Sequence, residues 1–199
     1  MSSVRRAFLD ACAWDVAVRK PGNVSVHSAG HGMQAQTFLD SAQACVGALC
    51  RPGASVGARI EQAVAATWAR VGCNTNLGIL LLCAPIAAAA ERAASPRDEV
   101  GLRRALAQVM DTLTVEDAAA AFRAIVQANP GGLGSAGQQD VRDTPTVTLR
   151  EAMALAADRD RIAFQYRDSG AALFDIGLTA LRGGDGPARA VSPDAVQRV

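Results

Sequence analysis

Apolar residues recur every three or four positions through most of this 199-residue chain. Val4, Phe8, Ala11 and Val18 show the spacing, which places them on one stripe of a helix over residues 4–18. The same periodicity predicts further helices over 37–49, 55–71, from about 77, 97–113, 114–129, 148–167 and on to about 182. We therefore expect an all-α fold, a single-domain helical bundle of about seven to eight helices with long functional loops.

The expected domain covers residues 1–182. Residues 183–199 resemble a loop followed by the start of an incomplete terminal helix. Within the domain, the helical pattern is interrupted at 19–34, 72–76 and 130–147. Helical bundles build ligand sites where loops and facing helices converge, so the functional residues are expected in these three loops.

Composition narrows the class of protein. Half of the residues are apolar but only 4% are aromatic, so the core must consist of Ala, Leu and Val. The net charge of +1, with mixed charges along the chain, argues against nucleic acid or a membrane surface as a partner. The apolar run 77–90 is too short to span a bilayer. Five cysteines without a CxxC motif indicate reduced thiols in a cytoplasmic protein, not zinc ligands.

The first loop holds the single lysine, Lys20, in a chain that otherwise uses arginine. A compact ammonium group can meet a phosphate oxygen as a point charge, which a planar guanidinium does differently. Asn23 follows in a predicted tight turn. His27 and His31 have the spacing of a helical metal pair, but the neighbouring glycines argue against a helix there. An exposed hydrophilic turn is the alternative for this loop.

The other two loops each allow two interpretations. Asn74, Thr75 and Asn76 precede an apolar helix, where they would cap its start or help its free amides to bind phosphate. The glycine-rich stretch 131–134 matches neither a P-loop nor a dinucleotide fingerprint, so a flexible lid or an anion-binding nest is expected.

Charged residues cluster in the predicted helix 148–167. Glu151, Asp158 and Gln165 are spaced seven apart, which on one helix places them on one stripe. Asp158 to Arg161 stand between apolar residues, so some of these charges are expected to be partly buried beside arginine or a bound cation. A surface ladder of ion pairs is the alternative.

Several of these segments, taken in order, resemble the triphosphoribosyl-dephospho-CoA synthase family. The resemblance covers about residues 14–182, and it is carried by Lys20-Pro21-Gly22-Asn23-Val24, His31, Phe38, Asn74 to Ile79, Gly131 to Gly134, Asp140-Val141, Arg150 to Met153, and Asp158 to Ala163 with Gln165-Tyr166. The ordered set is more specific than any one motif.

The resemblance implies an all-helical transferase that uses ATP as a glycosyl donor. The 2′-hydroxyl of 3′-dephospho-CoA attacks C1′ of the ATP ribose, adenine leaves, and the triphosphate stays attached. The product serves citrate lyase or malonate decarboxylase as a prosthetic-group precursor. The expected small molecules are ATP and dephospho-CoA with Mg²⁺, without zinc, haem or flavin, and a homodimer is allowed.

The reaction requires triphosphate neutralisation, a carboxylate and a proton donor for adenine. Asp160 and Asp158 are expected to bind Mg²⁺ or act as the base, with Asp140 as a further candidate. His31 is the candidate acid at adenine N7, or a ribose contact. The residues expected to bind nucleotide are Lys20, Asn23, Asn74, Thr75, Asn76, Gly131, Gly132, Asp140, Arg161 and Tyr166.

Two departures from the family pattern leave alternatives open. Members that resemble this chain continue past the equivalent of residue 182 with further helices, so the C-terminal part of the pocket is expected to be missing. The residues around Asn74 look closer to an outlying branch, whose acceptor would be another cofactor precursor such as a pterin. The remaining alternative is a catalytically inactive helical protein that binds nucleotide.

Overall fold

The computed structural model describes residues 3–18, 24–29, 32–95, 98–131 and 133–182. Its helices are α1 (Ser3–Ala17), α2 (Ala35–Leu49), α3 (Val56–Val71), α4 (Leu77–Arg92), α5 (Glu99–Asp111), α6 (Val115–Ala128), α7 (Leu149–Ala154), α8 (Arg161–Arg167), the π-helix η1 (Leu173–Leu178) and α9 (Thr179–Arg182). The described residues contain no β-strand, and the predicted all-α fold is confirmed. The predicted helix ends agree closely with the observed ones up to α6.

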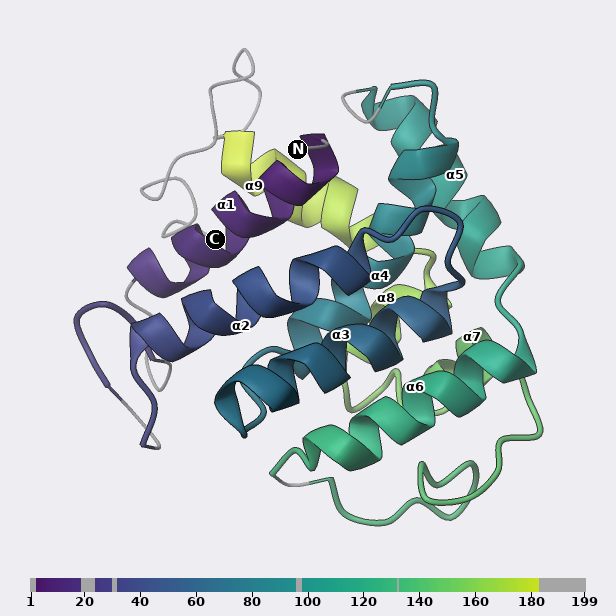
Figure 1. The fold of residues 1–199 in the computed structure, drawn as a ribbon. Coiled ribbons are helices and arrows are strands. Elements are labelled where there is room, and N and C mark those ends of the chain that lie inside the picture. Colours follow the sequence, from purple (N-terminus) through teal and green to yellow (C-terminus); the bar gives the residue numbers. More distant parts are fainter. Residues whose placement is uncertain (1–2, 19–23, 30–31, 96–97, 132, 183–199) are drawn as a thin grey trace.

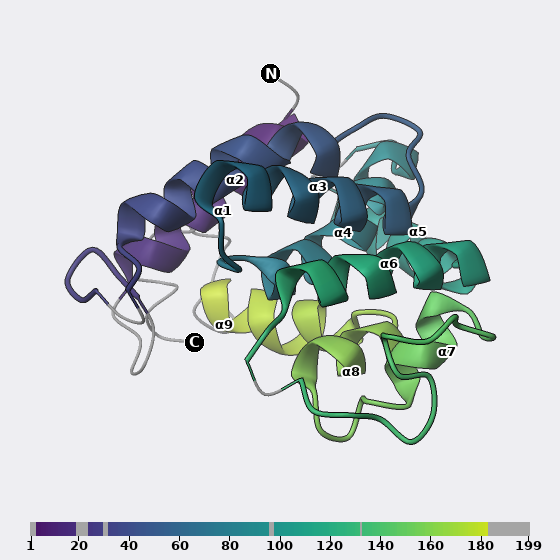
Figure 2. The ribbon, with the colours of Figure 1, turned by 60° about the horizontal axis from the view of Figure 1, so that its bottom comes forward.

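Helices α1, α2, α3 and α6 form a row across one side of the molecule, with α3 between α2 and α6 (Figures 1 and 2). The contact between α3 and α6 is close because Gly57 has no side chain. A Cβ at Gly57 would lie 2.6 Å from the Cα of Asp117. The Gly57 amide also donates to Asp117 Oδ1 at 2.7 Å, so the backbone of one helix meets the capping residue of the other.

Asp117 belongs to a capping box that starts α6, as the sequence Thr114-Val115-Glu116-Asp117 predicts. The Thr114 side chain accepts a hydrogen bond from the Asp117 amide, and the Asp117 carboxylate accepts one from the Thr114 amide. A second capping box joins Thr148 to Glu151 at the start of α7. Both boxes satisfy amides that a helix cannot pair internally.

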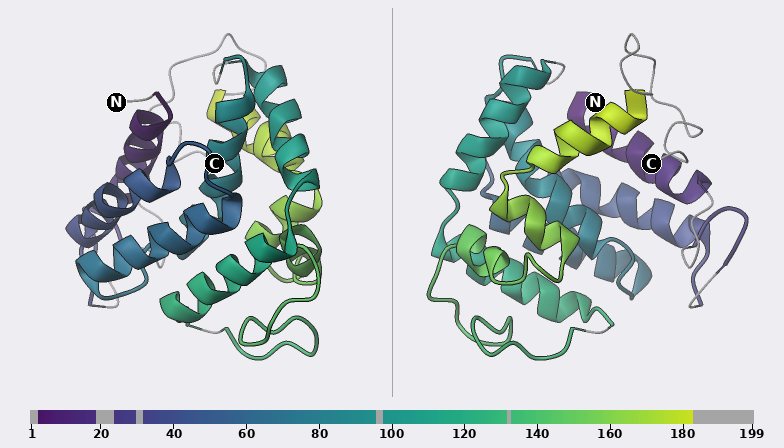
Figure 3. Two further views of the ribbon diagram at one scale, coloured as in Figure 1. Left: turned by 45° about the vertical axis from the view of Figure 1, so that its right-hand side comes forward. Right: turned by 180° about the vertical axis from the view of Figure 1, so that it is seen from behind.

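Helix α4 is the central element and contacts α1, α2, α3, α5, α6 and α8. Seen from behind, α8 and α9 lie in front of it (Figure 3, right). Pro85 lies inside the helix and has no amide hydrogen for the carbonyl of Leu81, four residues earlier. The Tyr166 hydroxyl of α8 donates to this carbonyl at 2.7 Å. One side chain therefore replaces the missing helical hydrogen bond and joins α8 to α4.

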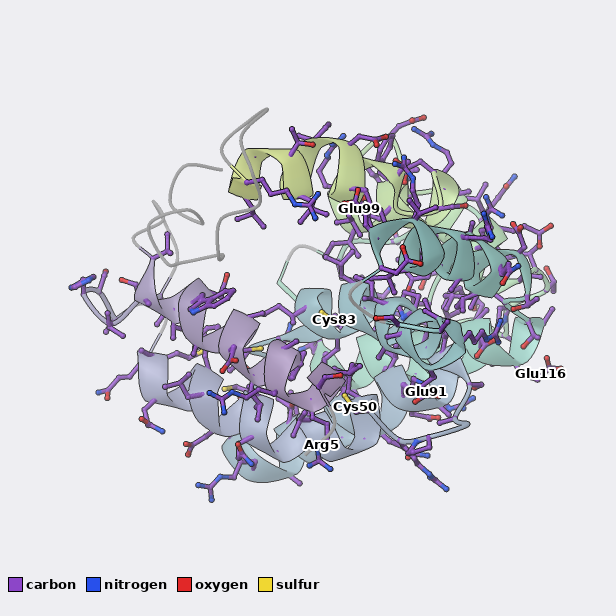
Figure 4. All side chains as sticks on the ribbon, turned by 90° about the horizontal axis from the view of Figure 1, so that it is seen from above. Arg5, Cys50, Cys83, Glu91, Glu99 and Glu116 are labelled. Carbon is purple, nitrogen blue, oxygen red and sulfur yellow. The ribbon has the colours of Figure 1, made fainter. Side chains whose placement is uncertain are left out.

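A buried arginine holds the corner where α2, α3 and α4 meet. Arg59 is 1% exposed and donates to the carbonyls of Leu49 and Ala54 and to the carboxylate of Glu91. Glu91 and Cys50, which interact electrostatically, are labelled at this corner in Figure 4. A buried guanidinium is tolerated here because each of its three nitrogens has an acceptor.

The prediction of one helix over 148–167 is wrong. The structure has α7 and α8, separated by the turn 155–160. Asp160 is extended and caps α8, where its Oδ1 accepts from the amides of Ile162 and Ala163 at 2.8 and 2.9 Å. Glu151, Asp158 and Gln165 therefore do not share one helical stripe. The expected partial burial of the charged segment is also wrong, because all four residues from Asp158 to Arg161 are exposed on this turn and the helix start.

Candidate functional site

A pocket of about 490 Å³ lies where α4 begins and α6 ends, beside α7 and α8. Its remaining wall is the segment between α6 and α7, of which residues 130–131 and 133–141 are called the pocket loop below. Figure 2 shows α7, α8 and this segment on one side of the molecule. The volume lies within the range of about 300–1,000 Å³ that is usual for small-molecule sites.

Helices supply most of the larger apolar side chains of the pocket. It is lined by Leu77, Leu81, Phe122, Ile125, Met153 and Ile162. Gly78 allows α8 to approach the start of α4, because a Cβ there would lie 2.8 Å from Ile162 Cδ1. The apolar surface can contact a flat or aliphatic group, and the polar contacts must come from elsewhere.

Only the first of the three polar residues before α4 lines the pocket. Asn74 Oδ1 accepts from the Leu77 amide at 3.1 Å. Thr75 instead donates to Ser41 Oγ at 2.7 Å, and the buried Asn76 side chain contacts Thr67 and Cys45. Asn74 therefore caps the helix start, as one interpretation of this loop predicts, whereas Thr75 and Asn76 make core hydrogen bonds and do not line the pocket.

The start of α4 also offers backbone donors. Among the described residues, the amides of Gly78 and Ile79 donate to no acceptor. Gly78 itself lines the pocket. Free first-turn amides carry the positive end of the helix dipole, so they favour an anionic or hydrogen-bond-accepting group at this wall.

Asp140 lines the pocket but its carboxylate is occupied. Oδ2 accepts from the Ala136 amide at 2.9 Å, and Oδ1 accepts from the Arg142 amide at 3.0 Å. These two amides, together with the Arg142 guanidinium, hold the pKa of Asp140 below its ordinary value. Arg142 also donates to the carbonyl of Gly134 at 2.9 Å, so the carboxylate organises the pocket loop.

The turn 155–160 brings one carboxylate and one guanidinium to the opposite wall, Asp160 and Arg159. Asp160 uses Oδ1 as the cap of α8, and among the described residues nothing donates to its Oδ2. Arg159 donates to the carbonyl of Leu155 at 3.2 Å. Asp160 is consequently the pocket carboxylate with an oxygen available to a ligand.

Three predicted site residues lie elsewhere or contact other groups. Asp158 is exposed and pairs with Arg167 at 2.7 Å, outside the pocket lining. Arg161 is exposed and its guanidinium lies over the Phe164 ring, 4.7 Å from the centroid. Tyr166 is fully buried beneath the site and serves the Leu81 carbonyl.

The remaining predicted residues divide between the pocket and the undescribed parts of the chain. Gly131 lines the pocket. Lys20, Asn23, His31 and Gly132 lie outside the described residues, so their roles stay predictions. The structure thus brings Asn74, Gly131, Asp140 and Asp160 together from three distant segments.

Several residues that line the pocket had no role in the predicted site, among them Met153, Arg159 and Phe122. Met153 follows Ala152 in α7, and Arg159 stands between two aspartates. Both fall within the motifs that carry the family resemblance, which is the signal by which they could have been found. Phe122 gave no such signal, because in the sequence it is one more apolar position of an amphipathic helix.

The described residues contain no group of three or more His, Cys, Asp or Glu side chains that could hold a metal ion. Asp158 is paired with Arg167, which leaves Asp160 as the carboxylate that this wall offers to Mg²⁺. A single carboxylate is compatible with Mg²⁺, which commonly takes one or two carboxylates and completes its shell with substrate phosphates and water.

The cysteines are free thiols in the structure. Burial raises the pKa of Cys12 to about 12 and that of Cys45 to about 11. A thiol with a raised pKa is a poor nucleophile at neutral pH, so both side chains serve as apolar core residues.

The structure is a helical fold with a candidate small-molecule pocket between helix ends and loops. A protein-family model described as CitG: ATP:dephospho-CoA triphosphoribosyl transferase matches residues 1–197. The chain belongs to this family of transferases, which confirms the resemblance found in the sequence. Comparison with curated proteins and with solved structures gave no match. Among the described residues, no helix combines the length and apolarity needed to cross a membrane.

Proposed function

We propose that this protein transfers the 5-triphosphoribosyl group of ATP to the 2′-hydroxyl of 3′-dephospho-CoA and releases adenine. Family membership over residues 1–197 is the observation that carries the proposal. The pocket supports it, because four of the residues expected at the site line one cavity. The product would serve citrate lyase or malonate decarboxylase as a prosthetic-group precursor, in the cytoplasm.

The proposed reaction is a substitution at an acetal carbon. The 2′-oxygen of dephospho-CoA forms a bond to C1′ of the ATP ribose, and the bond from C1′ to adenine N9 breaks. The electron pair of that bond leaves with adenine, which takes up a proton, while the acceptor hydroxyl loses one. A carboxylate beside C1′ would accept the hydroxyl proton and stabilise positive charge on the sugar ring.

Asp160 is the proposed carboxylate. Its Oδ1 is held by two amides of α8, which fixes the position of the side chain, and its Oδ2 is available on the pocket wall. Asp140 is less suited to this role because its two oxygens hold the pocket loop together. The alternative role for Asp160 is to bind Mg²⁺, which would neutralise part of the triphosphate charge.

Lys20 and His31 keep their expected roles within the proposal, as a triphosphate contact and as the acid at adenine. Replacing Lys20 with Arg tests the first role, because the charge is kept while the point-like ammonium is lost. A fall in ATP affinity or rate is expected. Unchanged affinity and rate would remove the special role of this lysine.

The test of the function is adenine release. The protein is mixed with ATP, Mg²⁺ and dephospho-CoA, and adenine and dephospho-CoA are followed by chromatography. Equal amounts of adenine formed and dephospho-CoA consumed are expected. Adenine without loss of dephospho-CoA would indicate another acceptor or hydrolysis, and ATP binding without adenine would indicate an inactive protein.

Asp160→Asn separates chemistry from capping. Asparagine is as good a helix cap as aspartate, so unfolding stability should change by a few tenths of a kcal/mol at most, while the charge is lost. We expect the rate of adenine release to fall by about 10²-fold or more, in keeping with the loss of a general base. Asp158→Asn, on the same turn but paired with Arg167, is the matched control and should keep the rate. A normal rate in Asp160→Asn would remove this carboxylate from catalysis.

A further inference from the structure

The charged side chains of the pocket do not favour a polyanion inside it. Its lining contains two carboxylates, Asp140 and Asp160, and one guanidinium, Arg159, and Arg142 outside the lining pairs with Asp140, so these side chains carry no net positive charge. A triphosphate placed among these groups would find no net positive charge to compensate its own charges, and it would lie beside the carboxylate of Asp160. The apolar helix residues on the pocket wall instead suit an uncharged ring system.

Unpaired cations lie at the rim, where α8 begins. Arg159 and Arg161 flank Asp160 in the sequence, and both are exposed. Among the described residues neither guanidinium has a carboxylate partner, since Arg159 donates to a backbone carbonyl and Arg161 lies over Phe164. By contrast, Arg142 and Arg167 on the same side of the molecule are both ion-paired.

We propose that the pocket takes an adenine nucleoside, and that its phosphates leave the pocket over Arg159 and Arg161. This orientation rests on the proposed function, because both of its substrates contain a phosphorylated adenosine. The base would lie against the apolar wall near Phe122, the ribose hydroxyls near Asp160 Oδ2, and the phosphates at the exposed guanidinium groups.

The polar groups of the pocket fit this assignment. Asn74 uses its carbonyl oxygen as a cap, and among the described residues its amide nitrogen donates to nothing. That nitrogen can donate to a ring nitrogen of a purine, which accepts hydrogen bonds. Asp160 Oδ2 can accept from a ribose hydroxyl, as acidic side chains do in other nucleotide sites.

Equilibrium binding of fragments tests the orientation. Adenosine, inorganic tripolyphosphate and pantetheine are titrated separately into the full chain by calorimetry. We expect adenosine to bind to the wild-type protein. This binding should be lost in Ala156→Phe, which places a ring on the pocket wall at a half-buried position. Tripolyphosphate that loses its binding in this variant, or pantetheine that competes with adenosine, would overturn the assignment.

A second pair of variants tests the path of the phosphates without filling the pocket. Arg161→Gln should weaken ATP by about tenfold, the loss of one charge-assisted contact, and leave adenosine unchanged. Arg104→Gln is the control, since this exposed arginine of α5 has no carboxylate partner among the described residues and does not line the pocket. Equal effects of the two variants on ATP would overturn the proposed exit, even if Ala156→Phe did not fold.

Competition identifies the source of the nucleoside and separates this inference from the reaction. The affinities for ATP and for dephospho-CoA are each measured with adenosine at saturation. The substrate whose apparent affinity falls is the one whose nucleoside occupies the pocket, and either result supports the assignment. No competition with either would overturn it. Adenine release by a protein that shows no competition would refute the pocket assignment alone, whereas competition without adenine release would refute the transferase function alone.

Discussion

Three aspartates near the site differ in function because their neighbours differ. The two oxygens of Asp140 each accept a hydrogen bond from a backbone amide, which holds the pocket loop in shape. Asp160 lines the pocket, uses one oxygen to cap a helix start, and has no donor to its other oxygen among the described residues. Asp158, two positions away, is exposed and paired with an arginine. The sequence alone treats the three carboxylates alike, because their roles depend on amides that only the folded backbone brings near them.

The pocket loop should loosen when Asp140 loses its charge. The pKa of Asp140 is lowered in the folded protein. The contribution of its carboxylate to loop stability is therefore complete above the unfolded pKa near 3.8, and it is lost as the pH falls through the folded pKa. Asp140→Ala removes the acceptor at any pH. We expect lower hydrogen-exchange protection of the Ala136 and Arg142 amides, measured by NMR at neutral pH.

The neighbouring Asp143 provides the control for this experiment. Its backbone amide donates to the carbonyl of Asp140, and its side chain is exposed. Asp143→Ala should therefore leave the protection of Ala136 and Arg142 unchanged. Equal protection in wild type and Asp140→Ala would mean that the loop holds its shape without the carboxylate.

Helices with several turns and recognisable caps could be predicted from the sequence, whereas the short ones could not. The apolar period and the Thr114 capping box located α6 because both are local signals. The segment 148–167 kept its apolar period across the turn 155–160, so periodicity alone indicated one helix. Asp160 is the start signal of α8, but an aspartate inside a run of charged residues is equally common on a helix surface.

The hydrogen bond from Tyr166 to the carbonyl of Leu81 joins α8 to α4 where Pro85 leaves that carbonyl without its helical donor. Tyr166→Phe removes the donor and leaves a buried carbonyl without a partner, which should cost about 1–3 kcal/mol of unfolding free energy. The measurement is chemical denaturation. The defect itself can be repaired, because an alanine at position 85 would supply the amide hydrogen that Pro85 lacks.

A double-mutant cycle tests this explanation. In a Pro85→Ala background, Tyr166→Phe should cost less than in wild type, with a coupling energy of about 1 kcal/mol. Additive effects of the two substitutions would show that the tyrosine hydroxyl does not replace the missing helical bond. Pro85→Ala alone also reveals how much packing the proline ring contributes at this buried position.

At the scale of the whole molecule, the pocket joins segments that are far apart in the chain. The start of α4, the pocket loop and the α7–α8 region each contribute part of its lining. The sequence predicted that loops would converge on a site, because bundles place ligands between helix ends. It could not predict that Thr75, Asn76 and Tyr166 would lie outside the pocket lining, since that depends on core contacts between distant helices.

A nucleotide bound across these segments should stabilise the entire fold. At a ligand concentration 100 times its Kd, ATP is expected to raise the unfolding free energy by about 2.7 kcal/mol. Hydrogen exchange should slow together at the start of α4, in the pocket loop and around the α7–α8 turn. Protection confined to one of these segments, with no gain in unfolding free energy, would contradict a shared pocket.

The division of labour within the pocket has an evolutionary consequence. Helices provide most of the larger apolar side chains, while most of the polar side chains belong to the pocket loop and to the turn 155–160. Loops accept substitutions and insertions more readily than packed helices. Natural variation, or a library of variants confined to these two segments, could therefore change the acceptor molecule without changing the scaffold, and members of one family could diverge in substrate while keeping the same helices.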